Sequence, residues 1–253
     1  MIRAATSSVC TRSPNSRKRG TLTELLLLSN STAPGGRFLE HALDAVAELV
    51  PAGSRLLFVA YASGDSARYA ETMQAAMRPL GVDVVAASTD AAVHREVARA
   101  DALFVGGGNT FRLLRTLHAL ELIAPIRARV LDGLPYLGAS AGSNVACPTI
   151  GTTNDMPIVE VPTLSALGLI PFQINPHYVE PDPASTHMGE TRDERIAEFF
   201  EENDRPVLGL REGSWLRVSD GTATLGGATR ARVFVREEAP YDVEPGADLS
   251  RLL

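Results

Sequence analysis

The sequence predicts an α/β fold of the three-layer type, in which a parallel sheet lies between two layers of helices. Two observations support this class. From Thr23 onward, short apolar runs alternate with amphipathic segments of helical length, and no internal repeat or low-complexity linker interrupts the alternation. Alternating strands and helices favour parallel strands with helices on both faces of the sheet. A chain of 253 residues is also long enough to bury a full core without disulfides or metals.

The strands are expected where short apolar runs occur, because a parallel strand covered on both faces needs no polar side. The runs in the first part of the chain are 25–28, 56–60, 82–87, 103–105 and 136–137. Two later runs, 172–174 and 207–210, continue the pattern. Three more, 216–218, 223–225 and 233–235, predict a closing C-terminal β meander.

Helices are expected between these strands, where apolar residues recur at helical spacing. The amphipathic segments are 38–49, 67–77, 91–100 and 111–117, and a further helix is expected to start after Gly142. The segment 191–200 carries its charges on one side. Its first residues, Thr191 and Glu194, have the spacing of a capping box.

Residues 1–22 differ from the rest of the chain because they are rich in Ser, Thr and Arg. The apolar core of a secretory signal is missing, since Glu24 interrupts the stretch that follows the basic part. We expect this segment to be a disordered extension or a mis-assigned start, with a transit peptide as the alternative. Residues 23–253 are then predicted to form a single domain.

Charge and composition exclude several classes of function. The net charge is −6, from 24 basic and 30 acidic residues, which argues against binding nucleic acid through a positive field. The longest aliphatic run, 25–28, is too short to cross a membrane. Lys18 is the one lysine, which argues against Schiff-base and P-loop chemistry. Cys10 and Cys147 cannot form a structural zinc site, and so few cysteines favour a reducing, cytoplasmic location.

The clearest chemical motif is the pentapeptide GASAG at 138–142, which follows an apolar strand and precedes a predicted helix. This is the context of a nucleophile elbow, in which a tight turn projects the serine above the sheet edge. Ser140 is therefore the candidate nucleophile. The N–H of Ala141, at the helix start, is placed to stabilise an oxyanion. The alternative is a simple Gly-Ser turn.

A serine nucleophile needs a base and a group that orients the base. Among the five histidines, His177 follows the strand at 172–174, so it is expected at the same carboxyl edge as Ser140. Asp155 lies in a polar turn between them and is the candidate acid; the alternative is a plain Asx-turn or cap residue. The order Ser, Asp, His matches α/β-hydrolases, but the spacing is much shorter.

A glycine cluster at 106–108 follows another predicted strand and opens the helix at 111–117. Its backbone N–H groups could hold a phosphate or supply a second oxyanion donor. The dinucleotide-binding register is absent, which disfavours a nucleotide site. Arg192, at the start of the helix at 191–200, could bind a substrate carboxylate through its forked guanidinium; otherwise it is a solvated helix residue.

Several stretches resemble one known family. They are LLLLSNST from Leu25, GGGNTFRLL from Gly106, GASAGSNVACPTIGTTNDMPIV from Gly138, FQINPHY from Phe172 and GETRDERI from Gly189. In this order, over roughly residues 24–236, they are similar to the peptidase E family, serine peptidase family S51. The resemblance implies a sheet of the class I glutamine amidotransferase-like type, related to flavodoxin-like folds. It also implies hydrolysis of dipeptides with an N-terminal aspartate, through an acyl-enzyme and without a metal or cofactor.

By motif position, the resemblance gives each candidate residue a role. The implied nucleophile, base and orienting acid are Ser140, His177 and Asp155. The implied oxyanion donors are Gly108 and Ala141, and the implied substrate contacts are Asn109 and Arg192. The acid that would bind the free α-amine of the substrate stays open between Glu190 and Glu212.

Other functions remain possible at this point. Val179 stands where related amidotransferases carry a glutamate two positions after the histidine, which disfavours that activity. The remaining alternatives are a cyanophycinase-like serine peptidase acting on aspartyl-arginine material, a general esterase and a non-catalytic binding protein. The loop at 179–186 varies in such enzymes and bears on side-chain selectivity. A small peptide is the expected partner, with no nucleic acid or membrane, and the chain is expected to be a monomer or a homodimer.

Overall fold

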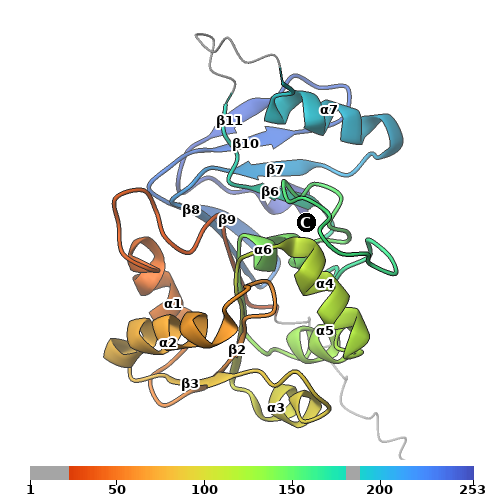
Figure 1. Ribbon diagram of the computed structural model, residues 1–253. Helices are drawn as coiled ribbons and strands as arrows, with labels where there is room; N and C mark the ends of the chain where they lie inside the picture. Colours follow the sequence, from red (N-terminus) through yellow and green to blue (C-terminus); the bar gives the residue numbers. More distant parts are fainter. Residues whose placement is uncertain (1–22, 181–188) are drawn as a thin grey trace, which may run out of the picture.

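The computed structural model describes residues 23–180 and 189–253. The predicted extension at 1–22 and most of the loop at 179–186 lie outside the described residues. Two sheets dominate the described part: seven strands in the order β3-β2-β4-β5-β1-β8-β9, and four in the order β11-β10-β7-β6. The first sheet occupies the centre of Figure 1 and the second lies above it.

Five parallel strands form most of the main sheet. They are β1 (Leu25–Leu28), β2 (Arg55–Val59), β3 (Asp83–Ala86), β4 (Ala102–Val105) and β5 (Tyr136–Ala139). All residues of β1, β4 and β5 are buried, as their apolar runs predict. β3 is an edge strand with exposed ends, so the burial on both faces that the run at 82–87 predicts is wrong for this strand.

Helices cover both faces of this sheet, which confirms the predicted three-layer α/β class. α1 (Leu43–Leu49) and α2 (Ser66–Met77) pack on one face (Figure 1). The other face carries α3 (Val93–Arg99), α4 (Thr110–Ala119), α5 (Ile123–Leu131) and α6 (Ala141–Ala146). Three short 3-10 turns complete the set: η1 (Glu40–Ala42), η2 (Arg78–Leu80) and η3 (Ser250–Leu252).

The sequence analysis does not predict α5. This helix has a proline, Pro125, in its first turn. Pro125 is tolerated there because the first N–H groups of a helix have no intrahelical acceptor.

The C-terminal strands divide between the two sheets instead of forming one meander. β8 (Ser214–Ser219) and β9 (Thr222–Gly227) form a hairpin that pairs antiparallel with β1 and so extends the main sheet. β10 (Ala231–Phe234) leaves the hairpin and pairs with β7 (Val207–Leu210). The buried side chains of β8 and β10 contribute to the same apolar core, so the two sheets share that core.

The second sheet also contains β6 (Gln173–Pro176), parallel to β7, and β11 (Tyr241–Val243), which the sequence did not predict. α7 (Arg192–Glu202) covers its outer face (Figure 1). The predicted capping box is confirmed: Thr191 and Glu194 bond reciprocally at the start of α7. The apolar contact below the helix involves Tyr178, Ile196 and Phe234.

One buried hydroxyl joins the two sheets where the carboxyl ends of their strands meet. Ser29, which follows β1, donates to the carbonyl of Leu210 at 2.8 Å and accepts from the N–H of His177 at 2.9 Å. Within residues 23–180 and 189–253, no helix has the length and apolarity needed to cross a membrane.

Candidate active site

Ser140 lies on a strained turn between β5 and α6. Its backbone has φ 52° and ψ −109°, a conformation that a residue with a side chain adopts only at a cost. The surroundings hold it there: its N–H donates to the carbonyl of Leu28 at 3.1 Å, and its carbonyl accepts from Ser143 and Asn144. This is the strand-turn-helix geometry that the pentapeptide predicts.

The glycines of the pentapeptide are required by close approaches of the backbone. A Cβ on Gly142 would lie 2.0 Å from the carbonyl oxygen of Val105, and one on Gly138 would lie 2.6 Å from the carbonyl oxygen of Gly142. The buried hydroxyl of Tyr136 also donates to that Gly142 carbonyl at 2.7 Å. These contacts fix the turn, so the direction of the Ser140 side chain is set by the backbone.

His177 comes directly after β6 and also has a left-handed backbone, with φ 54°. Its Nε2 lies 2.9 Å from Ser140 Oγ, within hydrogen-bond distance. The sequence-based pairing of these two residues therefore has the geometry that a nucleophile and its base require.

The carboxylate at His177 is Glu212, not Asp155. Glu212 Oε1 lies 2.7 Å from His177 Nδ1, and both side chains are 40% exposed. Glu212 is the second residue after β7 and His177 is the first after β6, and the two strands are parallel neighbours. The sequence signal is partial: a residue just after a predicted strand is expected at the carboxyl edge of a sheet, but the pairing of β6 with β7 comes from the structure.

The expectation that Asp155 orients His177 is therefore not met by the geometry. Asp155 accepts from the N–H and the hydroxyl of Thr110, at 2.7 and 2.6 Å, at the N-terminus of α4. A carboxylate is stabilised there by the free N–H groups and the helix dipole. Asp155 is thus a cap residue rather than an Asx turn, because its bonds reach a residue 45 positions away, and it fixes the start of α4 beside the glycine cluster.

The glycine cluster packs directly against the serine. A Cβ on Gly107 would lie 3.2 Å from Ser140 Cβ, and one on Gly108, which has φ 130°, would lie 2.4 Å from the carbonyl oxygen of Ala62. Within the described part of the chain, neither the N–H of Gly108 nor that of Ala141 has a hydrogen-bond acceptor. Both N–H groups are thus available, and their role as oxyanion donors stays a prediction.

Asn109 has a structural role at this position. Its Oδ1 accepts from the N–H of Arg112 at 3.0 Å, which caps α4, and its Nδ2 donates to the carbonyl of Met156 at 2.9 Å. Both ends of the amide are engaged within the protein, so a contact with substrate through this side chain also stays a prediction.

Arg192 is the first residue of α7 and is close enough to Asp155 for the carboxylate to affect its pKa. Burial lowers the pKa of Arg192, the nearby Arg195 lowers it further, and Asp155 opposes the shift. Arginine stays charged under these conditions. Glu190, a candidate for binding an amine, lies 3.4 Å from Arg195.

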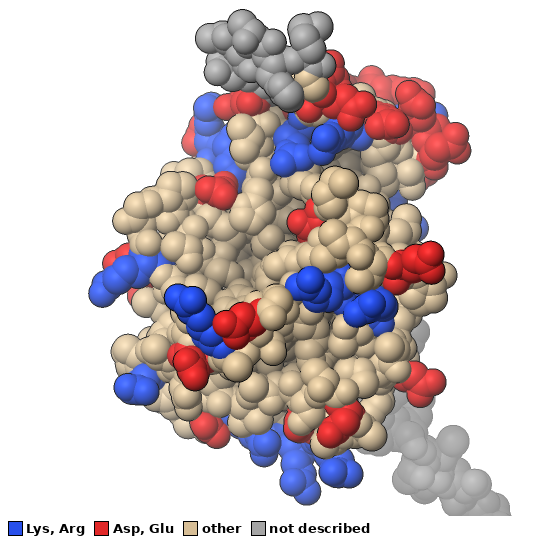
Figure 2. Space-filling view, in the orientation of Figure 1, with Lys and Arg blue, Asp and Glu red and all other residues tan. Residues whose placement is uncertain are grey.

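Acidic side chains are numerous on α7, the helix that Arg192 begins. Figure 2 shows them gathered at the upper right, over the region of α7. The helix itself contributes Asp193, Glu194, Glu198, Glu201 and Glu202. On the face shown in Figure 2, acidic and basic side chains lie next to each other in this region, so the arginines are the groups there that can attract a substrate carboxylate.

A serine, a histidine and a carboxylate in hydrogen-bonded series, at the carboxyl edge of a parallel sheet, are the arrangement of serine hydrolases. Comparison with known proteins agrees with this class. The family model of peptidase family S51 matches residues 25–226. The chain therefore belongs to peptidase family S51 and is an enzyme.

Two relatives illustrate the similarity. A protein named "Peptidase E" from Streptomyces coelicolor is 56% identical over 229 residues, which cover 90% of this chain and 94% of the relative. A protein named "Probable alpha-aspartyl dipeptidase" from Drosophila melanogaster is 46% identical over 232 residues, covering 90% and 97%. The family and these names together support a serine-type dipeptidase, a hydrolase.

The fold also matches a solved structure. A peptidase from an acI-B1 actinobacterium superposes with a TM-score of 0.70, at 15% identity, over 91% of this chain and 98% of the other. At this identity the likeness supports the fold alone.

Proposed function

We propose that this protein hydrolyses dipeptides with an N-terminal aspartate, through an acyl-enzyme on Ser140. The single observation that carries the proposal is the series Ser140 Oγ, His177 Nε2, His177 Nδ1, Glu212 Oε1, with distances of 2.9 and 2.7 Å. The names of the relatives supply the substrate class. The orienting acid in this proposal is Glu212, and Asp155 has a separate, structural role.

The reaction begins with attack of Ser140 Oγ on the peptide carbonyl that follows the aspartate. His177 Nε2 takes the hydroxyl proton and then passes it to the leaving amine, so the C–N bond breaks and an aspartyl ester of Ser140 remains. Water then attacks this ester with His177 as base, which releases aspartate and restores the serine. Glu212 holds the imidazole in the required tautomer and stabilises its positive charge.

The oxyanion of each tetrahedral intermediate needs donors that are free before the reaction. The N–H groups of Gly108 and Ala141 flank Ser140 and have no other acceptor within the described residues. Each such donor is worth a few kcal/mol of barrier in serine hydrolases. Arg192 pairs with the side-chain carboxylate of the substrate, because it is a half-buried cation beside the site.

We further propose a cytoplasmic monomer or homodimer whose partner is the small peptide itself. The low cysteine content supports the reducing compartment, and the acidic net charge argues against a nucleic-acid partner. Cell fractionation and sedimentation of the purified chain test these two points.

The function is tested by hydrolysis of Asp-Leu, Glu-Leu, Ala-Leu and N-acetyl-Asp-Leu at neutral pH with EDTA, using wild type and Ser140→Ala. We expect cleavage of Asp-Leu alone, and its loss in the variant. Cleavage of aspartyl-arginine polymer without Asp-Leu would favour the cyanophycinase-like alternative. Rapid cleavage of simple esters with no aspartate preference would favour an esterase, and binding of aspartyl ligands without turnover would favour a binding protein.

A further inference from the structure

Tyr178 directly follows His177, and its ring is buried in the second sheet. The ring packs edge to face against Phe234, with centroids 5.7 Å apart, and the Arg211 guanidinium lies 5.4 Å from its centroid. A Cβ on Gly209 of β7 would come within 2.8 Å of the ring, so the space above this strand is full. The ring position is therefore set by packing, and the direction of the hydroxyl follows from it.

The hydroxyl of Tyr178 makes one specific contact. It donates to Asp193 Oδ1 at 2.6 Å, a short bond of the charge-assisted kind. Burial, and then this carboxylate, raise the pKa of Tyr178 well above its ordinary value, so the phenol stays protonated and remains a donor. Asp193 also faces Arg232 of β10, at 3.7 Å.

This bond joins two pairs of chain neighbours. Tyr178 is adjacent to His177, and Asp193 is adjacent to Arg192 in the first turn of α7. The partners are 15 positions apart in the sequence. The capping box at Thr191 fixes the helix start internally, but its bonds lie within 191–194 and do not position the helix relative to His177.

We propose that the Tyr178 hydroxyl is a positioning group for substrate selection: through Asp193 it fixes the first turn of α7, and with it Arg192, relative to His177 and Ser140. The inference rests on the proposed function, in which Arg192 pairs with the aspartate carboxylate of the substrate. Bidentate pairing depends on orientation, and a shift of about 1 Å in a binding group can cost about 10²-fold in rate.

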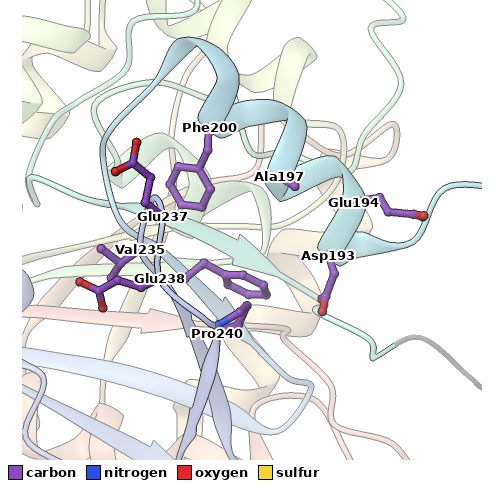
Figure 3. Close-up of a pocket in the computed structure, with 9 residues that line it drawn as sticks. Asp193, Glu194, Ala197, Phe200, Val235, Glu237, Glu238 and Pro240 are labelled. Atoms are coloured by element: carbon purple, nitrogen blue, oxygen red, sulfur yellow. The ribbon is translucent and has the colours of Figure 1, made fainter.

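Apolar packing holds the body of α7 through Ile196, but the surroundings of Asp193 leave the first turn of the helix dependent on polar contacts. Asp193 lines a cavity of about 490 Å³ between α7 and the turn after β10 (Figure 3). The cavity has Ala197, Phe200 and Phe234 among its apolar lining residues. Within residues 23–180 and 189–253, the carboxylate is held by the Tyr178 hydroxyl at 2.6 Å and by Arg232 at 3.7 Å, and it borders this cavity. Loss of the hydroxyl therefore leaves the longer ion pair alone, with room for Asp193 to move toward the cavity.

The test uses Tyr178→Phe, which keeps the packed ring and removes the hydroxyl. Calorimetry measures the binding of L-aspartate and L-asparagine, and kinetics measure kcat/KM for Asp-Leu and Ala-Leu. We expect aspartate binding to weaken about tenfold while asparagine binding changes less than about twofold. The preference for Asp-Leu over Ala-Leu should fall by a similar factor. Tyr241→Phe is the matched control. The Tyr241 hydroxyl accepts from Arg251, and Tyr241 lies in β11, at the other edge of the second sheet from β6.

A second variant separates positioning from simple stabilisation. Asp193→Ala removes the acceptor, so adding Tyr178→Phe to it should change the aspartate-to-asparagine binding ratio by less than about twofold. If the hydroxyl had a purely structural role, its removal in Tyr178→Phe would lower Tm and leave the binding ratio and the dipeptide preference as in wild type. That result would overturn the inference. If wild type cleaves neither dipeptide, the proposed function fails, and the binding ratio in Tyr178→Phe still decides the positioning role.

Discussion

Replacing Glu212 by glutamine tests which acid assists His177. The amide keeps the size of the side chain and removes the charge that faces Nδ1 across 2.7 Å. Two unit charges about 4 Å apart near a protein surface interact by about 4 kcal/mol. Both side chains are 40% exposed, so solvent screening reduces this value. Because the imidazolium forms only during the reaction, we expect kcat for Asp-Leu to fall by about 10²- to 10³-fold.

Asp155→Asn is the matched comparison. One oxygen of its carboxylate, Oδ2, accepts from both the N–H and the hydroxyl of Thr110, and the amide oxygen of asparagine can accept both bonds without the charge. We expect a loss of about 1.5 to 3 kcal/mol at most in the free energy of unfolding, and a fall in kcat of less than about tenfold. Glu160→Gln, at an exposed carboxylate, is the control for a loss of charge alone.

The assay is steady-state hydrolysis of Asp-Leu at saturating substrate, with Tm measured for each variant. Glu212→Gln should lose activity at nearly unchanged Tm, whereas Asp155→Asn should lose Tm more than activity. If Glu212→Gln kept wild-type kcat while Asp155→Asn lost about a thousandfold, the assignment of Glu212 as the orienting acid would be refuted.

Three further predictions concern the substrate site and the interior. Arg192→Ala should cost about 2–4 kcal/mol in kcat/KM for Asp-Leu and leave Ala-Leu unchanged; an unaltered Asp-over-Ala preference would remove its recognition role. Gly142→Ala places a Cβ 2.0 Å from the Val105 carbonyl oxygen, so the free energy of unfolding should fall by about 1–3 kcal/mol or more, which a lower Tm would show. The Tm of Gly64→Ala, where the added Cβ makes only ordinary contacts, should stay near that of wild type. Burial raises the pKa of Cys147 to about 12, so its thiol stays protonated and should resist iodoacetamide at pH 8 in the folded protein; peptide mass spectrometry showing native-state labelling would contradict this.

The main elements of the fold could be predicted because their signals are local. Runs such as 25–28 and 207–210 are apolar throughout, and both match strands to the residue. The sheet to which a strand belongs is not a local property. The runs at 216–218 and 233–235 look alike in the sequence, yet one pairs with β1 and the other with β7, because only tertiary packing decides between them.

The residues of the candidate site also differ in how far the sequence could predict them. Ser140 lies in the GASAG motif between a predicted strand and a predicted helix, and His177 directly follows a predicted strand, so both positions could be predicted from the sequence. The acid could not, because Asp155 and Glu212 both lie in polar turns that end near the same edge. The parallel pairing of β6 with β7 decides between them, and the sequence does not contain that register.

The position of β1 inside the main sheet has a consequence for the synthesis of this protein. Its four leucines pair on one side with β5 and on the other with β8, and the ion pair of Glu24 with Arg217 beside it spans 193 residues. At about 5–20 residues per second, a ribosome needs roughly 10–40 s to make that stretch. During this time one edge of an entirely apolar strand has no partner, which is a state prone to aggregation. The nascent chain therefore gains most from chaperone protection before β8 emerges, and peptidase activity can arise only after that moment.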